Sequence, residues 1–155
     1  MGKLSDKAMP ETKGKGAAAD RGKPQAADYQ ALANFRYALR RFLEFSGSAA
    51  KSVGLTPQQH QAMLSIIGVP EGQAVTVGFL AERMLLKHHS TVELVDRLVE
   101  LDLVARQPDA ADRRKVLLAL TPKGRRLLTK LSAAHIEELR RIRPVFADLL
   151  ERLDD

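Results

Sequence analysis

Apolar residues recur every three or four positions along most of the chain, which is the spacing of amphipathic helices. The first such stretch begins at Tyr29. A second follows Thr56, which can cap a helix that has Pro57 at its first position. Thr121 and Pro122 repeat this start signal ahead of a long amphipathic stretch. The pattern therefore predicts a helix near each end of the folded chain and shorter helices between them.

Between residues 76 and 121 the pattern changes from two short helices to two strands. Thr76 can cap the first helix, and the second runs from about Lys87 to Leu101, with apolar residues on one arc and polar residues on the other. Residues 103–106 and 115–120 are strand-like, and the proline, aspartates and arginines between them favour a hairpin turn. This order is that of a winged helix-turn-helix, which places one helix and one basic hairpin, the wing, against a nucleic-acid duplex.

The long stretch after Pro122 carries more apolar surface than one small domain needs. We therefore expect residues 29–54 and 122–155 to be dimerisation helices; the alternative is that they pack only on each other within one chain. Pro144 is expected to interrupt the long helix, because a residue that precedes proline avoids the helical conformation. The predicted fold class is mainly α with a small β-wing: a winged helix-turn-helix plus N- and C-terminal dimerisation helices.

Residues 1–28 differ from the rest of the chain because they are rich in Gly, Ala and Lys and contain no aromatic residue. Such a segment buries too little apolar surface to offset the entropy lost on ordering, so we expect a flexible basic tail. Its lysines could contact phosphates, or the tail could be inert. Residues 29–155 are expected to form one domain, in which residues 55–121 are the winged, DNA-binding part.

Charge and composition narrow the classes of function. The net charge of +6 favours a polyanionic partner, and residues 76–126 hold ten basic against seven acidic side chains. The chain has no cysteine, which excludes disulfides, thiolate zinc sites and thiol-based sensing. No apolar run approaches the roughly 18 residues that a membrane span needs, and no secretory signal segment is recognised. We therefore expect a cytoplasmic protein without a membrane partner.

The sequence does not indicate an enzyme. It shows no nucleophile motif, no phosphate-cradling glycine loop and no spaced carboxylate pair, so no catalytic residue and no cofactor is predicted. Adjacent residues on a helix point about 100° apart, which separates His88 from His89. His60 and His135 are isolated in sequence, so no metal site is predicted either.

These pieces resemble the MarR family of transcriptional regulators over residues 29–155. The likeness is carried by GLTPQQHQAML at 54–64 and by VGFLAERMLLKHHSTVELVDRLVELDLVARQPDAADRRKVLLALTPKG at 77–124. Asp112 and Arg114 in the wing, followed by LALT, are specific when they stand behind a VDRL helix. The resemblance implies a homodimer that binds a pseudo-palindromic operator in double-stranded DNA, often as a repressor, and that a small, often aromatic, organic acid releases.

By the same resemblance, the start of the second short helix touches base edges in the major groove. The matching residues are Lys87, His88, His89, Ser90 and Glu93. The helical wheel independently places His89, Ser90 and Glu93 on the polar ridge, whereas His88 leans toward the apolar arc and could instead be a partly buried structural residue.

The later part of the second short helix and the wing supply the second set of expected contacts. Arg97 can reach a phosphate, and Arg113, Arg114 and Lys115 suit the negative potential of a narrow minor groove; the alternative is a solvated turn. In the family, the arginine matching Arg114 either enters the groove or pairs with an aspartate matching Asp96. Asp96 and Asp112 are therefore the residues expected to brace the wing.

Family resemblance also places an effector pocket among the first, second and last helices. The candidate residues are Phe35, Arg36, Leu39, Arg40, His60, Met63 and Leu64. An arginine suits a carboxylate ligand because its planar fork donates two parallel hydrogen bonds. Each of these residues could equally be an ordinary surface or core residue.

The predicted function is a sequence-specific DNA-binding transcriptional regulator, a homodimeric repressor that a small organic acid releases from its operator. The alternative is a non-specific architectural DNA-binding protein without an effector. The two differ in the ratio of specific to non-specific affinity, which is near one for an architectural protein and spans several decades for a regulator.

Overall fold

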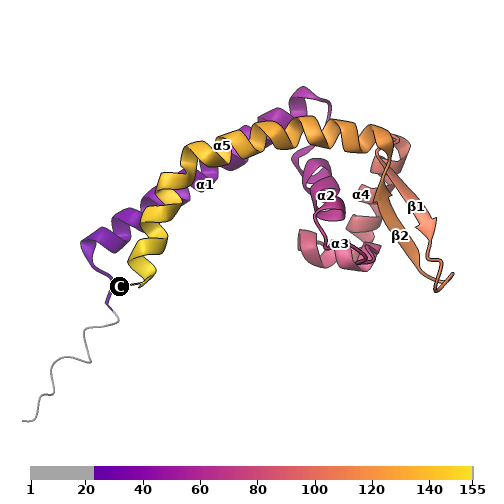
Figure 1. Cartoon of the computed structure of the whole chain (residues 1–155), viewed down its shortest axis with the longest axis horizontal. Helices are drawn as coiled ribbons and strands as arrows, with labels where there is room; N and C mark the ends of the chain where they lie inside the picture. The colour runs from indigo at the N-terminus through magenta and orange to yellow at the C-terminus, as the bar shows by residue number, and fades with distance from the viewer. Residues whose placement is uncertain (1–22, 155) are drawn as a thin grey trace, which may run out of the picture.

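The computed structural model of the chain describes residues 23–154 and consists of two long helices and a group of shorter elements at one end of them (Figure 1). In chain order, the elements are α1 (Ala26–Ser52), α2 (Pro57–Ile67), α3 (Val77–Met84), α4 (His88–Glu100), β1 (Val104–Pro108), β2 (Val116–Leu120) and α5 (Pro122–Asp154). The antiparallel helices α1 and α5 form an elongated unit that we call the arm. Helices α2–α4 and the two strands form the head, which hangs from the end of the arm where α1 finishes and α5 begins.

The predicted fold class is confirmed, since the described chain is mainly helical with one two-stranded antiparallel sheet. The start signals also act as expected. The backbone N–H of Gln59 donates to the hydroxyl of Thr56 at 3.1 Å, and the N–H of Thr56 donates to the side-chain carbonyl of Gln59 at 2.9 Å, which closes a capping box at the start of α2. The hydroxyl of Thr76 caps α3 by accepting from the N–H of Phe79 at 3.2 Å.

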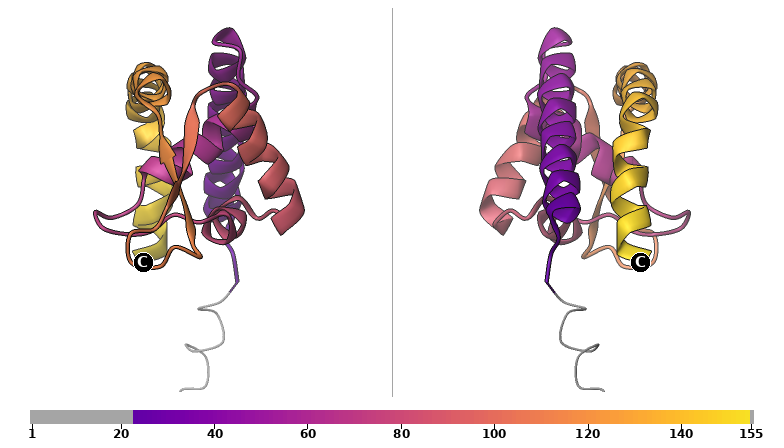
Figure 2. Two further views of the ribbon diagram at one scale, coloured as in Figure 1. Left: turned by 90° about the vertical axis from the view of Figure 1, so that its right-hand side faces the viewer. Right: turned by 90° about the vertical axis from the view of Figure 1, so that its left-hand side faces the viewer.

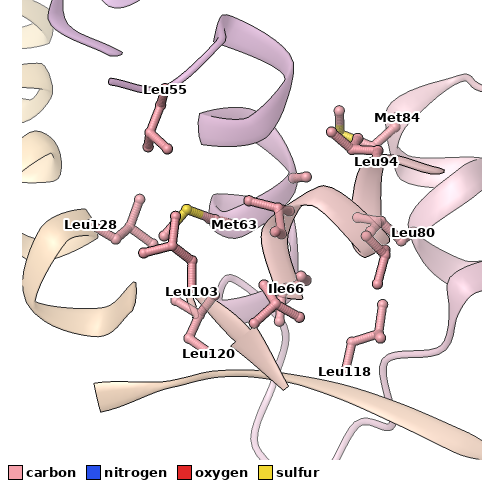
Figure 3. Close-up of a cluster of buried hydrophobic side chains, with 14 of the residues drawn as sticks. Leu55, Met63, Ile66, Leu80, Met84, Leu94, Leu103, Leu118, Leu120 and Leu128 are labelled. Carbon is pink, nitrogen blue, oxygen red and sulfur yellow. The ribbon is translucent and has the colours of Figure 1, made fainter. Parts of the chain in front are cut away.

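Apolar side chains from every element of the head meet in one core, to which the start of α5 also contributes (Figure 3). Met63, Leu80 and Leu98 lie in it with no exposed surface, and they come from α2, α3 and α4. Leu128, from the second turn of α5, reaches the same core and so fixes the arm to the head. Figure 2 shows the two arm helices as separate columns, with the head attached beside them.

The wing is joined to the arm through a single residue, Thr121, which lies between β2 and α5. Its hydroxyl donates to the carbonyl of Asp102 at 2.7 Å and accepts from the N–H of Gly124 at 3.0 Å. Its own N–H donates to the carbonyl of Leu103 at 3.1 Å. Thr121, and through it the first turn of α5, is therefore held to residues 102 and 103, which directly precede β1.

The two terminal helices differ from the expectation at two points. Helix α1 begins at Ala26 rather than Tyr29, because the carboxylate of Asp28 accepts from the N–H of Gln25 at 2.7 Å and completes a cap there. The end of the predicted tail, residues 26–28, is thus helical; its first 22 residues lie outside the described part. Helix α5 also continues through Pro144 instead of stopping before it.

Packing explains why Pro144 does not end α5. A proline inside a helix removes one backbone hydrogen bond and crowds the preceding turn, at a cost of about 3 kcal/mol. Beyond Pro144, however, the ring of Phe146 meets the ring of Phe35 on α1 edge to face, with centroids 5.2 Å apart. Contacts of this kind hold the last turns of α5 along α1, and they outweigh the local preference.

Gly124 allows α5 to start close against the head. A Cβ atom at this position would lie 2.2 Å from the carbonyl oxygen of Leu103. We therefore expect Gly124→Ala to lower the free energy of unfolding by about 1–3 kcal/mol, the range for overpacking in a rigid site. Gly47→Ala is the matched control, because its Cβ would meet only Pro57 Cγ at an ordinary 3.6 Å. Urea unfolding should show the control unchanged or stabilised by about 0.5–1 kcal/mol; equal values for both variants would contradict the close approach.

Candidate nucleic-acid interface

Helix α4 presents a polar side to solvent along its first three turns. Its opposite side is buried in the head and consists of Thr91, Leu94, Val95 and Leu98. Of the residues expected to meet DNA, Lys87, His88, His89, Glu93 and Arg97 are exposed, and Ser90 is half-buried. The exposure of His88 excludes the alternative in which it is a partly buried structural residue. Six predicted contact residues therefore lie on α4 or at its N-cap, and the side chains of five of them are exposed to solvent.

A tight turn sets the direction in which α4 leaves α3. Leu85 adopts a left-handed conformation with φ of 53°, and its N–H donates to the carbonyl of Glu82 at 3.2 Å. The next N–H, from Leu86, donates to the carbonyl of Ala81 at 3.0 Å. These bonds close the end of α3, and Lys87 then begins α4 in an extended conformation. A tight turn at residues 85–87 therefore separates α3 from α4.

The wing carries its cations on a hairpin turn that the aspartates organise. The carboxylate of Asp109 accepts from the N–H of Ala111 at 2.9 Å, and that of Asp112 accepts from the N–H of Arg114 at 3.1 Å. Asp112 also accepts from Nε of Arg114 at 3.3 Å, although that arginine side chain remains 92% exposed. Three cationic residues are exposed in this turn, namely Arg113, Arg114 and Lys115.

The contact between α4 and the wing differs from the expected pairing. Asp96 accepts a hydrogen bond from the guanidinium of Arg106 on β1, with N and O atoms 2.6 Å apart. Its partner is therefore Arg106 and not Arg114, which pairs with Asp112 instead. Asp96 thus joins α4 to the first strand of the wing, whereas Asp112 acts within the turn. The sequence offers one signal for Arg106, a cation on the strand that directly follows the helix, and the prediction missed it.

The beginning of α4 and the tip of the wing lie at the same end of the head, away from the arm (Figure 1). The end of the head that faces away from the arm therefore combines two exposed features. One is a helix start with hydrogen-bonding side chains, and the other is a hairpin turn with three cations. A helix of this kind fits the major groove of a DNA duplex, and guanidinium groups suit the adjacent minor groove. This arrangement defines a winged helix-turn-helix protein.

The seven candidate effector residues are not gathered around one pocket. Met63 is a core residue of the head, with no exposed surface, and Phe35 packs on Phe146 along the arm. His60 is buried, whereas four others are exposed on α1 and α2, namely Arg36, Leu39, Arg40 and Leu64. A cavity of about 510 Å³ lies instead between α1 and α5, where Tyr37, Arg41, Glu138 and Arg141 are among the lining residues. Helical periodicity identified the apolar faces but did not distinguish core positions from surface positions.

The part of the chain that the structure describes contains neither a cluster suited to a metal ion nor a membrane-spanning helix. In residues 23–154, no group of three or more His, Cys, Asp and Glu side chains is arranged to hold a metal ion. Within the same residues, every helix is too short or too polar to cross a bilayer.

Comparisons with known proteins agree with this architecture. A family model described as MarR family matches residues 53–115. An uncharacterized HTH-type transcriptional regulator of Bacillus subtilis, YsmB, is 36% identical over 74 residues, and this match covers 48% of the chain and 51% of that relative. The chain thus spans about half the length of YsmB. A putative transcriptional regulatory protein for the hcr operon of Thauera aromatica is 30% identical over 125 residues, with 74% of each chain covered.

Solved structures show the same fold. A MarR family protein from Bacillus stearothermophilus is 26% identical, with a TM-score of 0.65 over 83% of this chain and 91% of that one. A mutant of MepR from S. aureus bound to an oligodeoxyribonucleotide has a TM-score of 0.62 at 18% identity, over 81% of this chain and 96% of that one. The chain therefore belongs to the MarR family of DNA-binding transcriptional regulators. Both relatives are described as transcriptional regulators, the one from Thauera aromatica as a putative one.

Proposed function

We propose that this chain binds a pseudo-palindromic operator as a homodimer, and that it represses transcription until a small organic acid releases it. The observation that carries the proposal is the common position of the α4 start and the cationic wing tip at the free end of the head. The fold relative MepR is described in complex with an oligodeoxyribonucleotide, which supports a DNA partner for this fold.

Helix α4 is proposed to enter the major groove. His89 and Ser90 can each donate to or accept from base edges, and the carboxylate of Glu93 can accept from a cytosine amino group. Lys87 and His88 are exposed at the start of the helix, where they can reach bases or the flanking phosphates. Arg97, two turns further along, is placed to meet a phosphate. Base readout by α4 would supply the sequence specificity of the complex.

The wing is proposed to contact the neighbouring minor groove. Within residues 23–154, the side chain of Arg114 pairs with Asp112 alone, in an exposed ion pair, and exposed pairs of this kind contribute about 0–1 kcal/mol. The guanidinium can therefore exchange Asp112 for the negative potential of the groove at little cost. Arg113 and Lys115 would add phosphate contacts beside it. The bond between Asp96 and Arg106 keeps the wing close to α4 during this contact.

The arm is proposed to form the dimer interface. Helices α1 and α5 do pack on each other within one chain, through buried residues such as Ala31, Ala38 and Leu131. Large apolar side chains nevertheless remain exposed along the arm: Tyr29, Leu32, Tyr37, Leu39, Leu43, Ile136, Leu139 and Leu150. A second copy of the chain is the partner that would cover them, because its own arm carries the same apolar face. The two heads would then read half-sites on successive turns of DNA.

Release by a small organic acid is inferred from the resemblance to the MarR family. The arm cavity places Arg41 and Arg141 near Glu138 and Asp148, so its charge is mixed. A carboxylate could use one of the arginines as a bidentate partner. A thermal-shift screen of aromatic acids, repeated with operator DNA, is expected to find a compound that both raises the melting temperature and releases the DNA. Compounds that raise the melting temperature without releasing DNA would contradict the regulatory role.

The specificity of DNA binding decides between a regulator and an architectural protein. In gel shifts at about 0.15 M salt, DNA from upstream of the chain's own gene should bind at least about a thousandfold more tightly than scrambled DNA of the same composition. Equal competition by scrambled DNA would refute the regulator and favour the architectural alternative. A salt titration of both complexes would show how much of each affinity comes from phosphate contacts.

A further inference from the structure

Two histidines that are far apart in sequence meet where the head joins the arm. His60 lies on α2 and His135 on α5, and the residues are only 4% and 8% exposed. Their ring centroids are 4.7 Å apart, with the planes inclined by 46°. The rings of Phe42 and Phe45 on α1 meet His135 edge to face. This junction therefore holds two titratable rings in an apolar setting, which is unusual unless hydrogen bonds satisfy them.

Two hydrogen bonds define which ring nitrogen of His135 carries a proton when the ring is neutral. Its Nδ1 lies 2.6 Å from the carbonyl oxygen of Leu131, and its Nε2 lies 2.8 Å from the hydroxyl of Ser46 on α1. A carbonyl can only accept, so Nδ1 carries a proton. In the neutral ring, Nε2 accepts from the hydroxyl of Ser46. Ser46, His135 and His60 thus connect α1, α5 and α2, which are the two helices of the arm and the first helix of the head.

Few charged groups near His60 and His135 could stabilise a positive charge on either ring. From α1, the groups that contact His135 are Ser46 and the two phenylalanine rings, all of them neutral. From α2, the contacting titratable group is His60 itself. On α5, the buried carboxylate of Glu138 lies one turn beyond His135, but it pairs with Arg141 at 3.1 Å. A proton on either imidazole therefore places a positive charge beside the other ring.

The acid–base behaviour of His60 follows from this setting. Burial lowers the pKa of His60 below its ordinary value of 6.5, and the charge on a protonated His135 lowers it further. As the pH falls below about 6.5, His60 is therefore less protonated in the folded chain than in the unfolded chain. The stability that His60 contributes is present above that pH and is lost as the pH falls through the lowered pKa of the folded state.

We propose that Ser46, His60 and His135 form a proton-sensitive clamp, which holds the head on the arm while both imidazoles are neutral and loosens when the pair takes up protons. This proposal rests on the proposed function for its consequence in DNA binding. If the arm joins two subunits, the clamp sets the distance between two reading helices, and an operator accepts only a narrow range of half-site spacings. Acid would therefore weaken specific binding more than non-specific binding.

His88 and His89 must be separated from this effect, because both are exposed on the proposed DNA surface. A proton on either ring adds a positive charge near the phosphates and strengthens binding to any DNA sequence. That effect has the opposite sign from the loosening of the clamp. The comparison between the wild type and a variant of the clamp removes it, since both proteins keep His88 and His89.

The test compares the wild type with His60→Phe, which keeps a ring in the junction but cannot take up a proton there. From about pH 8 to pH 5.5, the operator-to-scrambled ratio of the wild type is expected to fall about tenfold. The ratio of His60→Phe should change less than about threefold over the same range. Ser48→Ala is the matched control: it removes an exposed hydroxyl from the same helix, outside the clamp, and keeps both imidazoles, so its pH dependence should persist. Equal acid losses in the wild type and His60→Phe, or no loss in either, would overturn the clamp.

Two measurements on the free protein keep this proposal separate from the proposed function. NMR titration of the four histidine rings should show His60 taking up its proton below the ordinary pH, and His135→Gln should move that titration upward. Urea unfolding should show stability falling with acid in the wild type and falling less in His60→Phe. If both hold while no DNA binds specifically, the clamp stands and the regulator proposal fails. If His60 titrates at its ordinary value, the clamp fails whatever the DNA result.

Discussion

A negative charge on the apolar face of the arm, introduced by Leu43→Glu, is expected to lower operator affinity by about a hundredfold or more. Leu43 is 59% exposed in the single chain, so its replacement disturbs little packing within the subunit. In the proposed dimer the same side chain is covered by the second copy, where an unpaired carboxylate would be buried at high cost. The loss of affinity follows because two linked half-sites exceed one half-site by about 10²–10⁴ in avidity.

Sedimentation and gel shifts together check this result. The variant should sediment near the 17.1 kDa mass of one chain, whereas the wild type should have twice that mass. Leu101→Glu is the matched control, because Leu101 is an exposed leucine of the head, outside the arm. A Leu43→Glu protein that remains dimeric and binds operator normally would show that this part of the arm is not the interface.

Replacement of Arg114 by alanine is expected to weaken operator binding more than tenfold, because a fully desolvated guanidinium contact contributes about 1–3 kcal/mol. The side chain is 92% exposed and bonds only to Asp112 in its own turn, so the fold should remain intact. Binding to scrambled DNA should fall by a smaller factor, since that complex depends on general phosphate attraction. Fluorescence anisotropy at physiological salt can measure both affinities.

Two further variants separate the shape of Arg114 from its charge. Arg114→Lys keeps the charge but loses the planar fork, and it should recover only part of the affinity if the groove recognises the guanidinium. Lys130→Ala removes an exposed cation from α5, away from the wing, and should leave the affinity nearly unchanged. Unchanged operator affinity of Arg114→Ala at physiological salt would remove the wing from the mechanism.

Local signals were sufficient to predict most of the elements. Thr56 and Gln59 form the capping box that their spacing predicts, and Thr76 caps α3 as expected. The polar arc predicted for the second short helix is the exposed side of α4, with Asp96 and Arg97 on it. Each of these features depends on residues within one or two helical turns of each other. Both interaction partners can therefore be recognised in a short stretch of sequence.

Features that depend on tertiary packing were missed. His60 and His135 seemed isolated because 75 positions separate them, yet α2 and α5 bring their rings together. Asp96 was expected to pair with an arginine of the wing turn, but the first strand brings Arg106 nearer. Pro144 signals a helix end by its local chemistry, whereas α5 continues beyond it and packs against α1, for example through Phe146 and Phe35. The DNA contacts and the effector remain predictions.

The one-residue connection at Thr121 has a mechanical consequence. The hydroxyl and the amide of Thr121 hold the end of β2 and the first turn of α5 to residues 102 and 103. The hairpin and the long helix should therefore move as one rigid unit. A few degrees of tilt in the helix would swing the arginine-bearing loop sideways by a distance that grows with the length of the hairpin. If the arm joins two subunits as proposed, a ligand that tilts α5 would move the wing, and so change DNA binding, without touching the DNA surface.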